Sequence, residues 1–547
     1  MPKITLEHVT KRWGNFYGVD DLNLVIDDNA FVTLLGPSGC GKTTTLRMIA
    51  GLETPTSGKI TIGDRVVYDS EEGINIPANK RKVGFLFQNY ALWPNMTVYD
   101  NISFGLKNIK EELDLFDENA RAKKAILVAL NKPSEIVNII NECIDKKGKL
   151  DENKAMIKLI DRYTISQYSA KTLLGYKLHT SNNVEADAKK LVDALTSEIE
   201  NAKAQAKSKG YEVDDNFNFL KDGKVAKAVR RLSKEEIDLS VRRVARIVNI
   251  GMFMDRYPAE LSGGQQQRVA IARTLAPEPS VLFMDEPLSN LDAKLRLEMR
   301  SELQRLHLET GSTFVYVTHD QVEAMTLATR ICLIDNGLLQ QYDAPLDVYN
   351  KPNNLFVADF VGNPSINFIE AKGKQNGENL DLTIFDDKNV KFVPNESLDL
   401  EAWHKETDAL LEKKKEAEAD KAKQKGFVEK SNKETVFKCH INTTEENEDY
   451  GDEIELTDED FVIGIRPEFI EISEDGKFEG EIYSSMPTGM ETTVRVAIGK
   501  YLLTGVMFGG IVYELNEKVN VNFKGNSAIL FDRKTGKIIS IGAIETK

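Results

Sequence analysis

Short apolar runs separated by turns follow one another along the first 107 residues, and this pattern predicts alternating strands and helices. The run Phe31–Leu35 is apolar and rich in β-forming residues, which predicts a buried strand. A glycine-rich stretch follows, and Thr43–Ala50 then predicts a helix that ends at Gly51. The same pattern resumes from about residue 232 to residue 362. Further strands are predicted at Val83–Phe87, Val281–Met284 and Phe314–Val317, and a helix is predicted at Gln265–Ala276.

Residues 108–231 interrupt this α/β pattern. Helix-forming residues dominate there, glycines are few, and Pro133 is the single proline. The stretch Asn183–Ala206 places apolar side chains at helical spacing and predicts a long helix. Ser233 and Glu236 then have the spacing of a capping box that opens the next helix. We interpret residues 108–231 as a folded helical insertion, and no motif in it indicates a function.

Residues 363–547 have a third pattern, in which short strands are separated by Gly, Asn or Pro turns, and this predicts a small β-barrel. A charged insertion lies within it at about residues 401–435. There, Glu412–Lys425 is rich in Lys, Glu and Ala and predicts a solvated helix or a disordered loop. The acidic stretch Glu445–Asp460 predicts a surface loop rather than a metal site. The predicted strands are Phe461–Ile465, Thr492–Ile498, Val519–Phe523 and Ala528–Phe531.

The bulk properties limit the classes of protein that fit this chain. Its 547 residues predict two to four domains, and a net charge of −15 argues against a nucleic-acid-binding protein. The four cysteines form no C-x-x-C pair, which suits a reducing cytosol. No run approaches the ~18 apolar residues of a membrane span, and Met1–Thr5 lacks an apolar signal core. We therefore expect a cytosolic protein that reaches a membrane only through a partner.

A complete G-x-x-x-x-G-K-[ST] phosphate loop follows the first predicted strand. Its glycines let backbone N–H groups converge on phosphate oxygens, and the helix that follows adds its positive end. Lys42 would place its charge near the β- and γ-phosphates, and Thr43 would offer a hydroxyl to Mg²⁺. The alternative, a chance glycine-rich turn, does not explain the strand–loop–helix context. The predicted nucleotide-binding residues here are Gly36, Pro37, Ser38, Gly39, Cys40, Gly41, Lys42, Thr43 and Thr44.

An Asp-Glu pair follows the predicted strand Val281–Met284, so both carboxylates emerge at the strand's C-terminal end, where ligands bind in α/β sheets. Asp285 is then a partner of Mg²⁺, and Glu286 is placed to polarise an attacking water. The alternative for Glu286 is a cap on the turn before Pro287. Upstream, Ser262-Gly263-Gly264 opens a predicted helix and forms a second anion site by the same physics.

The string Leu261-Ser262-Gly263-Gly264-Gln265, combined with the phosphate loop and the Asp-Glu strand, resembles the ATP-binding-cassette ATPases. The resemblance implies that Gln88 meets Mg²⁺ and the attacking water, that His319 contacts the γ-phosphate, and that Trp13 stacks on adenine with Tyr17 as the fallback. It also implies that Gln265 and Asp292, the latter in the inter-subunit loop Ser289–Asp292, belong to the ATP site. Each ATP lies between two subunits in this family. We therefore expect a dimer, with a second copy or with a related ATPase.

The finer resemblance is to the ATPase subunits of carbohydrate-uptake importers. It implies an OB-like C-terminal regulatory domain, two transmembrane permease subunits as partners, an indirect solute-binding protein, and a place at the cytoplasmic face of the membrane. Glycerol-3-phosphate importers have nearly the same ATPase, and polyamine importers are the alternative. The stretches that carry it are Val83–Leu106, Tyr257–Arg300, Tyr316–Leu327, Gly362–Phe368, Gly464–Glu468 and Leu530–Gly536.

These patterns predict an ATPase domain at residues 1–362, containing the helical insertion 108–231, and a C-terminal domain at residues 363–547. The insertion lies in the helical subdomain, where it is inert expansion, an extra grip on the permeases, or a site for another protein. A chain that binds ATP as a regulatory or scaffolding module without turnover is a different class of function. The presence of Glu286, Gln88 and His319 argues against that class.

Overall fold

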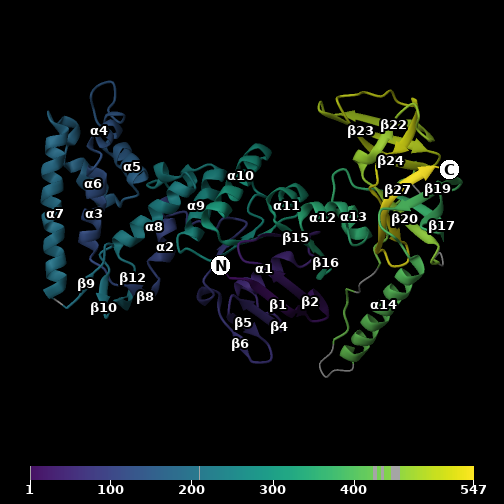
Figure 1. The fold of residues 1–547 in the computed structure, drawn as a ribbon, viewed down its shortest axis with the longest axis horizontal. Coiled ribbons are helices and arrows are strands. Elements are labelled where there is room, and N and C mark those ends of the chain that lie inside the picture. Colours follow the sequence, from purple (N-terminus) through teal and green to yellow (C-terminus); the bar gives the residue numbers. More distant parts are fainter. Residues whose placement is uncertain (1, 209, 423–427, 433–435, 445–455, 547) are drawn as a thin grey trace. The chain divides into compact units, whose positions relative to one another are not determined.

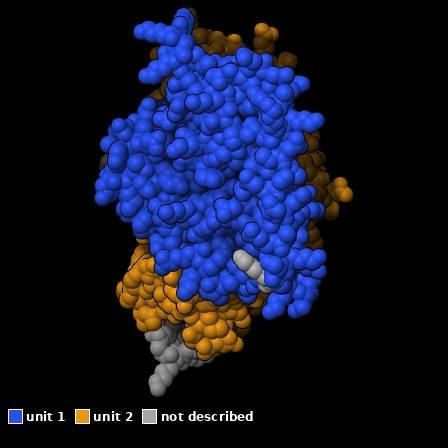
Figure 2. Space-filling view, turned by 90° about the vertical axis from the view of Figure 1, so that its left-hand side faces the viewer, with its two compact units in different colours: residues 1, 82–314 blue, residues 2–81, 315–547 orange. Residues whose placement is uncertain are grey.

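The computed structural model describes residues 2–208, 210–422, 428–432, 436–444 and 456–546. They divide into two compact units (Figure 2). The first unit is Lys82–Phe314, and the second joins Pro2–Arg81 to Val315–Lys547. The boundary falls within strand β14 (Thr313–Val317). Among the described residues, no helix combines the length and the apolar character that crossing a bilayer requires.

The N-terminal part of the second unit contains a five-stranded antiparallel sheet in the order β2-β1-β4-β5-β6, so that β2 forms one edge. Its strands are β1 (Ile4–Trp13), β2 (Phe16–Ile26), β4 (Ser57–Ile62), β5 (Arg65–Asp69) and β6 (Ile74–Asn75). The predicted strand Phe31–Leu35 is β3, whose five residues are all buried. It pairs in parallel with β15 (Arg330–Asp335), and β15 pairs antiparallel with β16 (Leu338–Asp343).

Four helices of the second unit surround these strands. The predicted helix after β3 is α1, which begins one residue earlier than predicted and ends against Gly51 in the left-handed conformation, as the glycine signal indicates. The remaining three lie after β14, and α11 packs against β3. The four helices are α1 (Lys42–Ala50), α11 (Gln321–Leu327), α12 (Pro345–Asn350) and α13 (Leu355–Phe360).

The first unit joins a parallel strand pair to a group of packed helices. Strands β7 (Val83–Leu86) and β13 (Val281–Asp285) pair in parallel, with Met284 opposite Leu86. Helix α2 packs on both α8 and α9. Parallel pairing brings the carboxyl ends of the two strands to one edge, which sets up the site below. The helices are α2 (Val98–Leu106), α8 (Lys234–Ile247), α9 (Gly263–Leu275) and α10 (Ala293–Thr310).

The insertion is folded around its own apolar core, with residues such as Ile136, Ile140 and Leu159 fully buried. Its longest helix, α7, confirms the predicted helix at Asn183–Ala206 and packs along α3 and α4 (Figure 1). Its helices are α3 (Glu118–Leu130), α4 (Pro133–Asn141), α5 (Glu152–Tyr163), α6 (Gln167–Gly175) and α7 (Val184–Ser208).

The insertion also contains strands, which the sequence patterns did not predict. At its base β8 (Lys110–Asp114) pairs antiparallel with β12 (Lys227–Arg231), so the entering and leaving segments form a two-stranded stalk. The purely helical prediction is therefore incomplete. A small three-stranded sheet adds β9 (Glu212–Val213), β10 (Phe219–Lys221) and β11 (Lys224–Val225).

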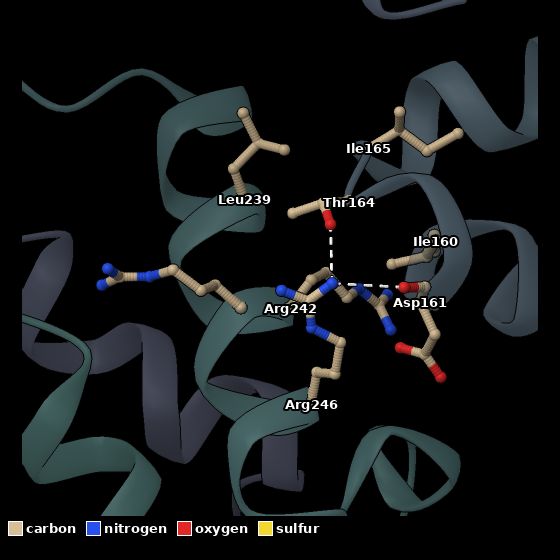
Figure 3. A pocket seen from close by; sticks show the side chains of 8 residues that line it. Ile160, Asp161, Thr164, Ile165, Leu239, Arg242 and Arg246 are labelled. Atoms are coloured by element: carbon tan, nitrogen blue, oxygen red, sulfur yellow. Dashed lines mark hydrogen bonds between the residues drawn. The ribbon is translucent and has the colours of Figure 1, made fainter. Parts of the chain in front are cut away.

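The insertion contacts α8 through hydrogen bonds (Figure 3). Arg246 donates to Thr164 Oγ1 at 2.6 Å and to the Asp161 carbonyl at 3.2 Å. About two turns closer to the helix start, the backbone N–H of Gln167 donates to Asp238 at 2.6 Å. The predicted capping box of Ser233 and Glu236 is present at the start of α8. The insertion is thus attached at its stalk and along one face of α8.

The C-terminal part of the second unit contains a closed antiparallel barrel, which confirms the barrel prediction. It also contains a separate five-stranded sheet in the order β21-β25-β22-β23-β24, whose strands lie in the chain between β20 and β26 and include the predicted strands Thr492–Ile498 and Val519–Phe523. The barrel consists of β17 (Asn367–Asn376), β18 (Asn379–Ile384), β19 (Lys388–Pro394), β20 (Asp460–Ile465), β26 (Ala528–Asp532) and β27 (Ile538–Thr546). The sheet consists of β21 (Ile470–Ile472), β22 (Phe478–Pro487), β23 (Glu491–Ile498), β24 (Tyr501–Phe508) and β25 (Lys518–Phe523).

Helix α14 (Leu400–Ala422) lies between β19 and β20 and confirms the helical alternative for the described part of the charged insertion. The rest of that predicted stretch, residues 423–425, lies outside the described residues. So does most of the predicted acidic loop, residues 445–455.

Candidate active site

The phosphate loop adopts a conformation that requires glycine. Gly36, Gly39 and Gly41 have φ values of 149°, 82° and 105°. A Cβ on Gly36 would lie 2.1 Å from the Ile334 carbonyl oxygen, so only glycine fits there. Gly41 is the N-cap of α1, and the residues that follow it therefore present their backbone N–H groups at the helix start. This arrangement suits the binding of a polyphosphate.

Lys42 lies within the phosphate loop. Its side chain is buried, and its ammonium donates to the carbonyl oxygens of Gly36 and Pro37, both at 2.7 Å. Burial is the largest influence on neighbouring Cys40 and raises the pKa of its thiol, so Cys40 remains a neutral part of the wall. The single cation of the loop is thus held inside the loop by two of its carbonyl oxygens.

Trp13 and the phosphate loop approach the same glycine of β2. Trp13 ends β1, its side chain is 48% exposed, and a Cβ on Gly18 would lie 2.5 Å from its ring. A Cβ on Gly41 would lie 2.2 Å from the Gly18 carbonyl oxygen. The backbone of Gly18 therefore lies between the indole and the phosphate loop. An exposed aromatic face beside a phosphate site can stack on a nucleotide base.

Tyr17, the predicted fallback for base stacking, is engaged elsewhere. Its hydroxyl donates to the Val428 carbonyl at 3.1 Å, and Lys430 lies 5.5 Å above its ring. The geometry therefore favours Trp13 over Tyr17.

His319 follows β14 on an exposed turn of the second unit, at the start of α11. A buried carboxylate beneath this turn, Glu323, accepts hydrogen bonds from Tyr316 at 2.7 Å and from Thr318 at 2.8 Å. Asp320 caps α11 by accepting from the backbone N–H groups of Val322 and Glu323. The backbone on both sides of His319 is therefore fixed. Sequence reasoning did not single out Glu323, since a Glu in a helical run carries no signal of burial.

In the first unit, the predicted catalytic side chains meet at the carboxyl ends of β7 and β13. Gln88 Nε2 donates to Glu286 Oε2 at 3.3 Å and to Ser289 Oγ at 3.4 Å. The Gln88 carbonyl in turn accepts from Asn290 at 3.0 Å. Asp285 is the buried last residue of β13. A carboxylate held by an amide at the carboxyl end of a strand can orient and deprotonate a water.

Glu286 has a φ of 45°, in the left-handed region that non-glycine residues rarely adopt. Such a conformation costs about 1–3 kcal/mol and persists only where the surroundings determine it. Here Ser289 Oγ donates to the Glu286 carbonyl at 2.9 Å and stabilises the turn. The alternative role as a simple turn cap does not account for this strain together with the contact to Gln88.

The loop after Gln88 is fixed by Arg273, a residue that sequence reasoning missed. Its guanidinium donates to the carbonyls of Tyr90 and Ala91, both at 2.6 Å, and both residues have positive φ. It also lies 5.2 Å above the Trp93 ring. Arg273 belongs to α9, so it directly connects the loop from Gln88 to Trp93 with the helix that Ser262 caps. An arginine in a helical run gives no sequence signal for this contact.

Ser262 is the N-cap of α9. Its hydroxyl accepts from the Gln265 N–H at 3.4 Å, and the Gln265 side chain accepts from the Ser262 N–H at 3.0 Å. Ser262 and Gly263 are exposed, whereas Gly264 is buried against Leu295. The helix start is therefore presented at the surface, as an anion site requires. Asp292 caps α10 by accepting from Leu295 N–H at 2.9 Å.

The predicted Mg²⁺ partners supply the oxygen ligands that this ion prefers, namely a hydroxyl from Thr43, a carboxylate from Asp285 and an amide from Gln88. Mg²⁺ in nucleotide sites binds through one or two such groups together with phosphate oxygens. The described part of the chain contains no cluster of three or more His, Cys, Asp or Glu side chains placed to bind a metal, so the fit is judged on the donor types alone. The residues present therefore fit the ion.

The structure thus groups the predicted residues in two sets. Trp13, the phosphate loop and His319 belong to the second unit, where Gly18 connects the first two. The first unit holds the set Gln88, Asp285, Glu286, Ser262–Gln265 and Asp292.

Comparison with known proteins gives the chain its family. The sequence profile of the ABC transporter family matches residues 19–289. The trehalose/maltose import ATP-binding protein MalK of Thermococcus litoralis is 35% identical over 72% of this chain and 73% of its own length. The spermidine/putrescine import ATP-binding protein PotA of Ureaplasma parvum is 35% identical over 66% of this chain and 77% of its own length.

A third relative, the xylose/arabinose import ATP-binding protein XacJ of Haloferax volcanii, is 38% identical over 68% of this chain and 64% of its own length. The phosphate loop, the Asp-Glu strand end and the capped Ser-Gly-Gly helix start all lie within the residues that match the family. The chain therefore belongs to the ABC transporter family and is one of its ATPases.

Proposed function

We propose that this chain hydrolyses ATP to drive an importer of sugars or of a related solute such as glycerol-3-phosphate. The observation that carries the proposal is the contact of Gln88 with Glu286 at the carboxyl ends of β7 and β13. The contact supports a role for Glu286 as general base beside an amide that can orient water, which hydrolysis requires and mere nucleotide binding does not.

In the proposed cycle, two copies of the chain, or one copy and a related ATPase, close on two ATP molecules. Trp13 stacks on adenine, Lys42 binds the β- and γ-phosphates, and Ser262–Gly264 of the other copy contacts the γ-phosphate. Thr43, Asp285 and Gln88 would hold Mg²⁺, which when bound neutralises charge on the phosphate oxygens. We assign His319 to contact with the γ-phosphate. We assign Gln265 and Asp292 to the part of the ATP site that lies between the two copies.

Hydrolysis then follows from residues of this chain. Gln88 orients a water, Glu286 accepts its proton, and the water oxygen bonds to the γ-phosphorus. The bond from that phosphorus to the bridging oxygen breaks, and the electron pair leaves with ADP. Lys42 stabilises the negative charge that develops on the phosphate oxygens. The strained turn at Glu286 keeps its carboxylate at the carboxyl end of β13 during this reaction.

Coupling to transport requires a surface that changes with nucleotide state. We assign this role to the segment from Gln88 to Pro94, which Arg273 connects to α9. Dimer closure would bias two transmembrane permease subunits between two states from the cytoplasmic face of the membrane. In this proposal residues 1–362 form the ATPase domain, and residues 363–547 form a regulatory domain that contains the charged insertion at about 401–435.

The solute class is supported by relatives named for sugar import, at 35% and 38% identity. The relative named for spermidine/putrescine import is equally similar at 35% identity, so a polyamine importer is the second candidate. Reconstituting the ATPase with its permeases and solute-binding protein in vesicles separates the two. Stimulation of ATP hydrolysis by a sugar supports the first candidate, and stimulation by spermidine supports the second.

Hydrolysis itself is tested with Glu286→Gln. An ATPase should lose turnover by a factor of about 10² to 10⁴ and accumulate as an ATP-bound dimer, visible by size-exclusion chromatography. A regulatory module without turnover would show the same nucleotide binding and oligomeric state before and after the substitution. Glu260→Gln, on the turn before the α9 cap, controls for the loss of one carboxylate.

A further inference from the structure

The segment Val428–Asn432, which comes after α14 in the sequence, contacts the hairpin that carries Trp13. We call this segment the strap. It belongs to the charged insertion of the C-terminal domain, and its Asn432 bonds to Tyr17 of β2, which Figure 1 labels. The strap and the hairpin lie in the same compact unit. No motif in the strap predicted this contact.

Asn432 binds β2 as a neighbouring strand would. Its side-chain oxygen accepts from the Tyr17 N–H at 3.0 Å, and its side-chain nitrogen donates to the Tyr17 carbonyl at 2.9 Å. Because β2 is an edge strand, these two backbone groups point away from β1 and need an outside partner. A carboxamide supplies both the acceptor and the donor from one side chain.

Further contacts hold the same hairpin. The Ser431 N–H donates to the Asn15 carbonyl at 2.9 Å, and the Tyr17 hydroxyl donates to the Val428 carbonyl at 3.1 Å. Lys430 pairs with Asp20, whose side chain is only 11% exposed, and covers the Tyr17 ring. The Trp13 ring stays exposed. The strap therefore fixes the hairpin without covering its base-stacking face.

The anchored hairpin is connected to the phosphate loop by backbone bonds. The Asp20 N–H donates to the Gly337 carbonyl at 3.0 Å, and the Gly337 N–H donates to the Cys40 carbonyl at 3.0 Å. The Gly18 carbonyl packs against Gly41. A displacement of β2 at Tyr17 would therefore change the distance between Trp13 and the phosphate loop, which the base and the phosphates of one nucleotide must span.

We propose that Lys430 and Asn432 are positioning residues for nucleotide binding, and that through them the inserted segment of the C-terminal domain sets the affinity of the ATPase for ATP. The inference rests on the proposed function only in naming ATP as the ligand. A hairpin already fixed in the bound geometry loses less conformational freedom when the base stacks, so affinity rises. The bonds of Lys430 and Asn432 go to the hairpin that carries Trp13, so their effect should fall on KM and not on kcat.

The test compares Lys430→Ala/Asn432→Ala with wild type in the full chain. We expect the KM for ATP and the Kd for the fluorescent analogue mant-ADP to rise about five- to tenfold, with kcat changed less than about twofold. The single variant Lys430→Arg keeps the ion pair and the ring contact. It should therefore keep most of the wild-type affinity for nucleotide. Lys405→Ala is the matched control, because Lys405 lies on α14 and pairs with Glu401.

Each result decides the inference. The inference is overturned if KM and Kd are unchanged in the double variant, or if the Lys405→Ala control loses as much nucleotide affinity. It is also overturned if either value falls, which would mean that the strap weakens nucleotide binding. If the double variant does not fold, Tyr17→Phe removes the Val428 contact alone and should raise Kd by a smaller factor, whereas no change would overturn the inference. Binding of mant-ADP needs no turnover, so failure of the proposed hydrolysis leaves this test intact.

Discussion

The amide of Gln88 and the carboxylate of Glu286 lie 3.3 Å apart although 198 residues separate them in the chain. Gln88 lies two residues after the end of β7, and Glu286 directly follows the end of β13. The parallel pairing of these strands brings the two ends together. The contact holds one carboxylate oxygen of Glu286 at the end of the strand. It is the feature from which the proposed hydrolytic role follows.

Replacing Gln88 should therefore separate hydrolysis from binding. In Gln88→Ala, Glu286 loses the amide that orients it, and we expect kcat to fall about a hundredfold with mant-ADP affinity nearly unchanged. Asn89→Ala, which removes the exposed amide one residue later, is the matched control. Steady-state ATPase rates with a parallel binding titration decide the matter. Full activity in Gln88→Ala would remove this contact from the mechanism.

Replacing two of the positive-φ glycines of the phosphate loop by alanine should lower the unfolding free energy by different amounts. At Gly41 a Cβ would meet the Gly18 carbonyl at 2.2 Å, whereas at Gly39 no atom lies within 4 Å. Gly39→Ala should cost about 1–2 kcal/mol of unfolding free energy, from backbone conformation alone. Gly41→Ala should cost more, since the carbonyl beneath Trp13 must also move. Urea unfolding of the two variants gives the order, and equal losses would show that the contact at Gly18 is not limiting.

Much of the fold could be predicted because it follows from local patterns. The strands at Phe31 and Val281 and the capping box at Ser233 depend on apolar runs and hydrogen-bonding side chains within a few residues. The stalk of the insertion could not be predicted, because Lys110–Asp114 is polar and does not alternate. It forms a strand through a partner more than 100 residues away, with cross-strand contacts such as Arg230 to the Asp114 carbonyl at 2.7 Å.

The candidate site divides in the same way. Motif residues such as Lys42 and Glu286 could be named because glycine, charge and strand position act together within a short string. The residues that hold these motifs, Arg273 and Asn432, could not be named. Their partners are backbone carbonyls and amides, which every residue has, so the sequence carries no pattern for such contacts.

Glu236 and Glu235, neighbours on α8, should give opposite pH dependence of stability. Burial tends to raise the pKa of Glu236, but hydrogen bonds from Arg230 and from the Ser233 N–H outweigh it, and the pKa is lowered from 4.5. Its contribution to stability is therefore present above pH 4.5 and lost as the pH falls through the lowered value. Burial raises the pKa of Glu235, so its contribution is present at low pH and lost as the pH rises.

Glu236→Gln should consequently lower Tm at pH 7, and this difference from wild type should shrink on acidification below pH 4.5. Glu235→Gln should be neutral or stabilising at pH 7, with a difference that grows with pH. Differential scanning calorimetry of both variants between about pH 3.5 and 7.5 covers the transition of a carboxyl group. Parallel pH profiles for the two variants would contradict the assignment of opposite shifts.

Arg466 should be the most sensitive arginine in the C-terminal domain. Its side chain is only 2% exposed, and its guanidinium donates to the carbonyls of Ala358 at 3.0 Å and Tyr349 at 2.8 Å and also to that of Val361. Arg466→Ala leaves these carbonyls without their donor and opens a cavity, so we expect a loss of about 3–5 kcal/mol of unfolding free energy. Arg466→Lys should recover only part, because an ammonium lacks the planar fork. Urea unfolding measures both, with exposed Arg495→Ala as the control, and a loss at Arg466 no larger than at Arg495 would refute the structural role.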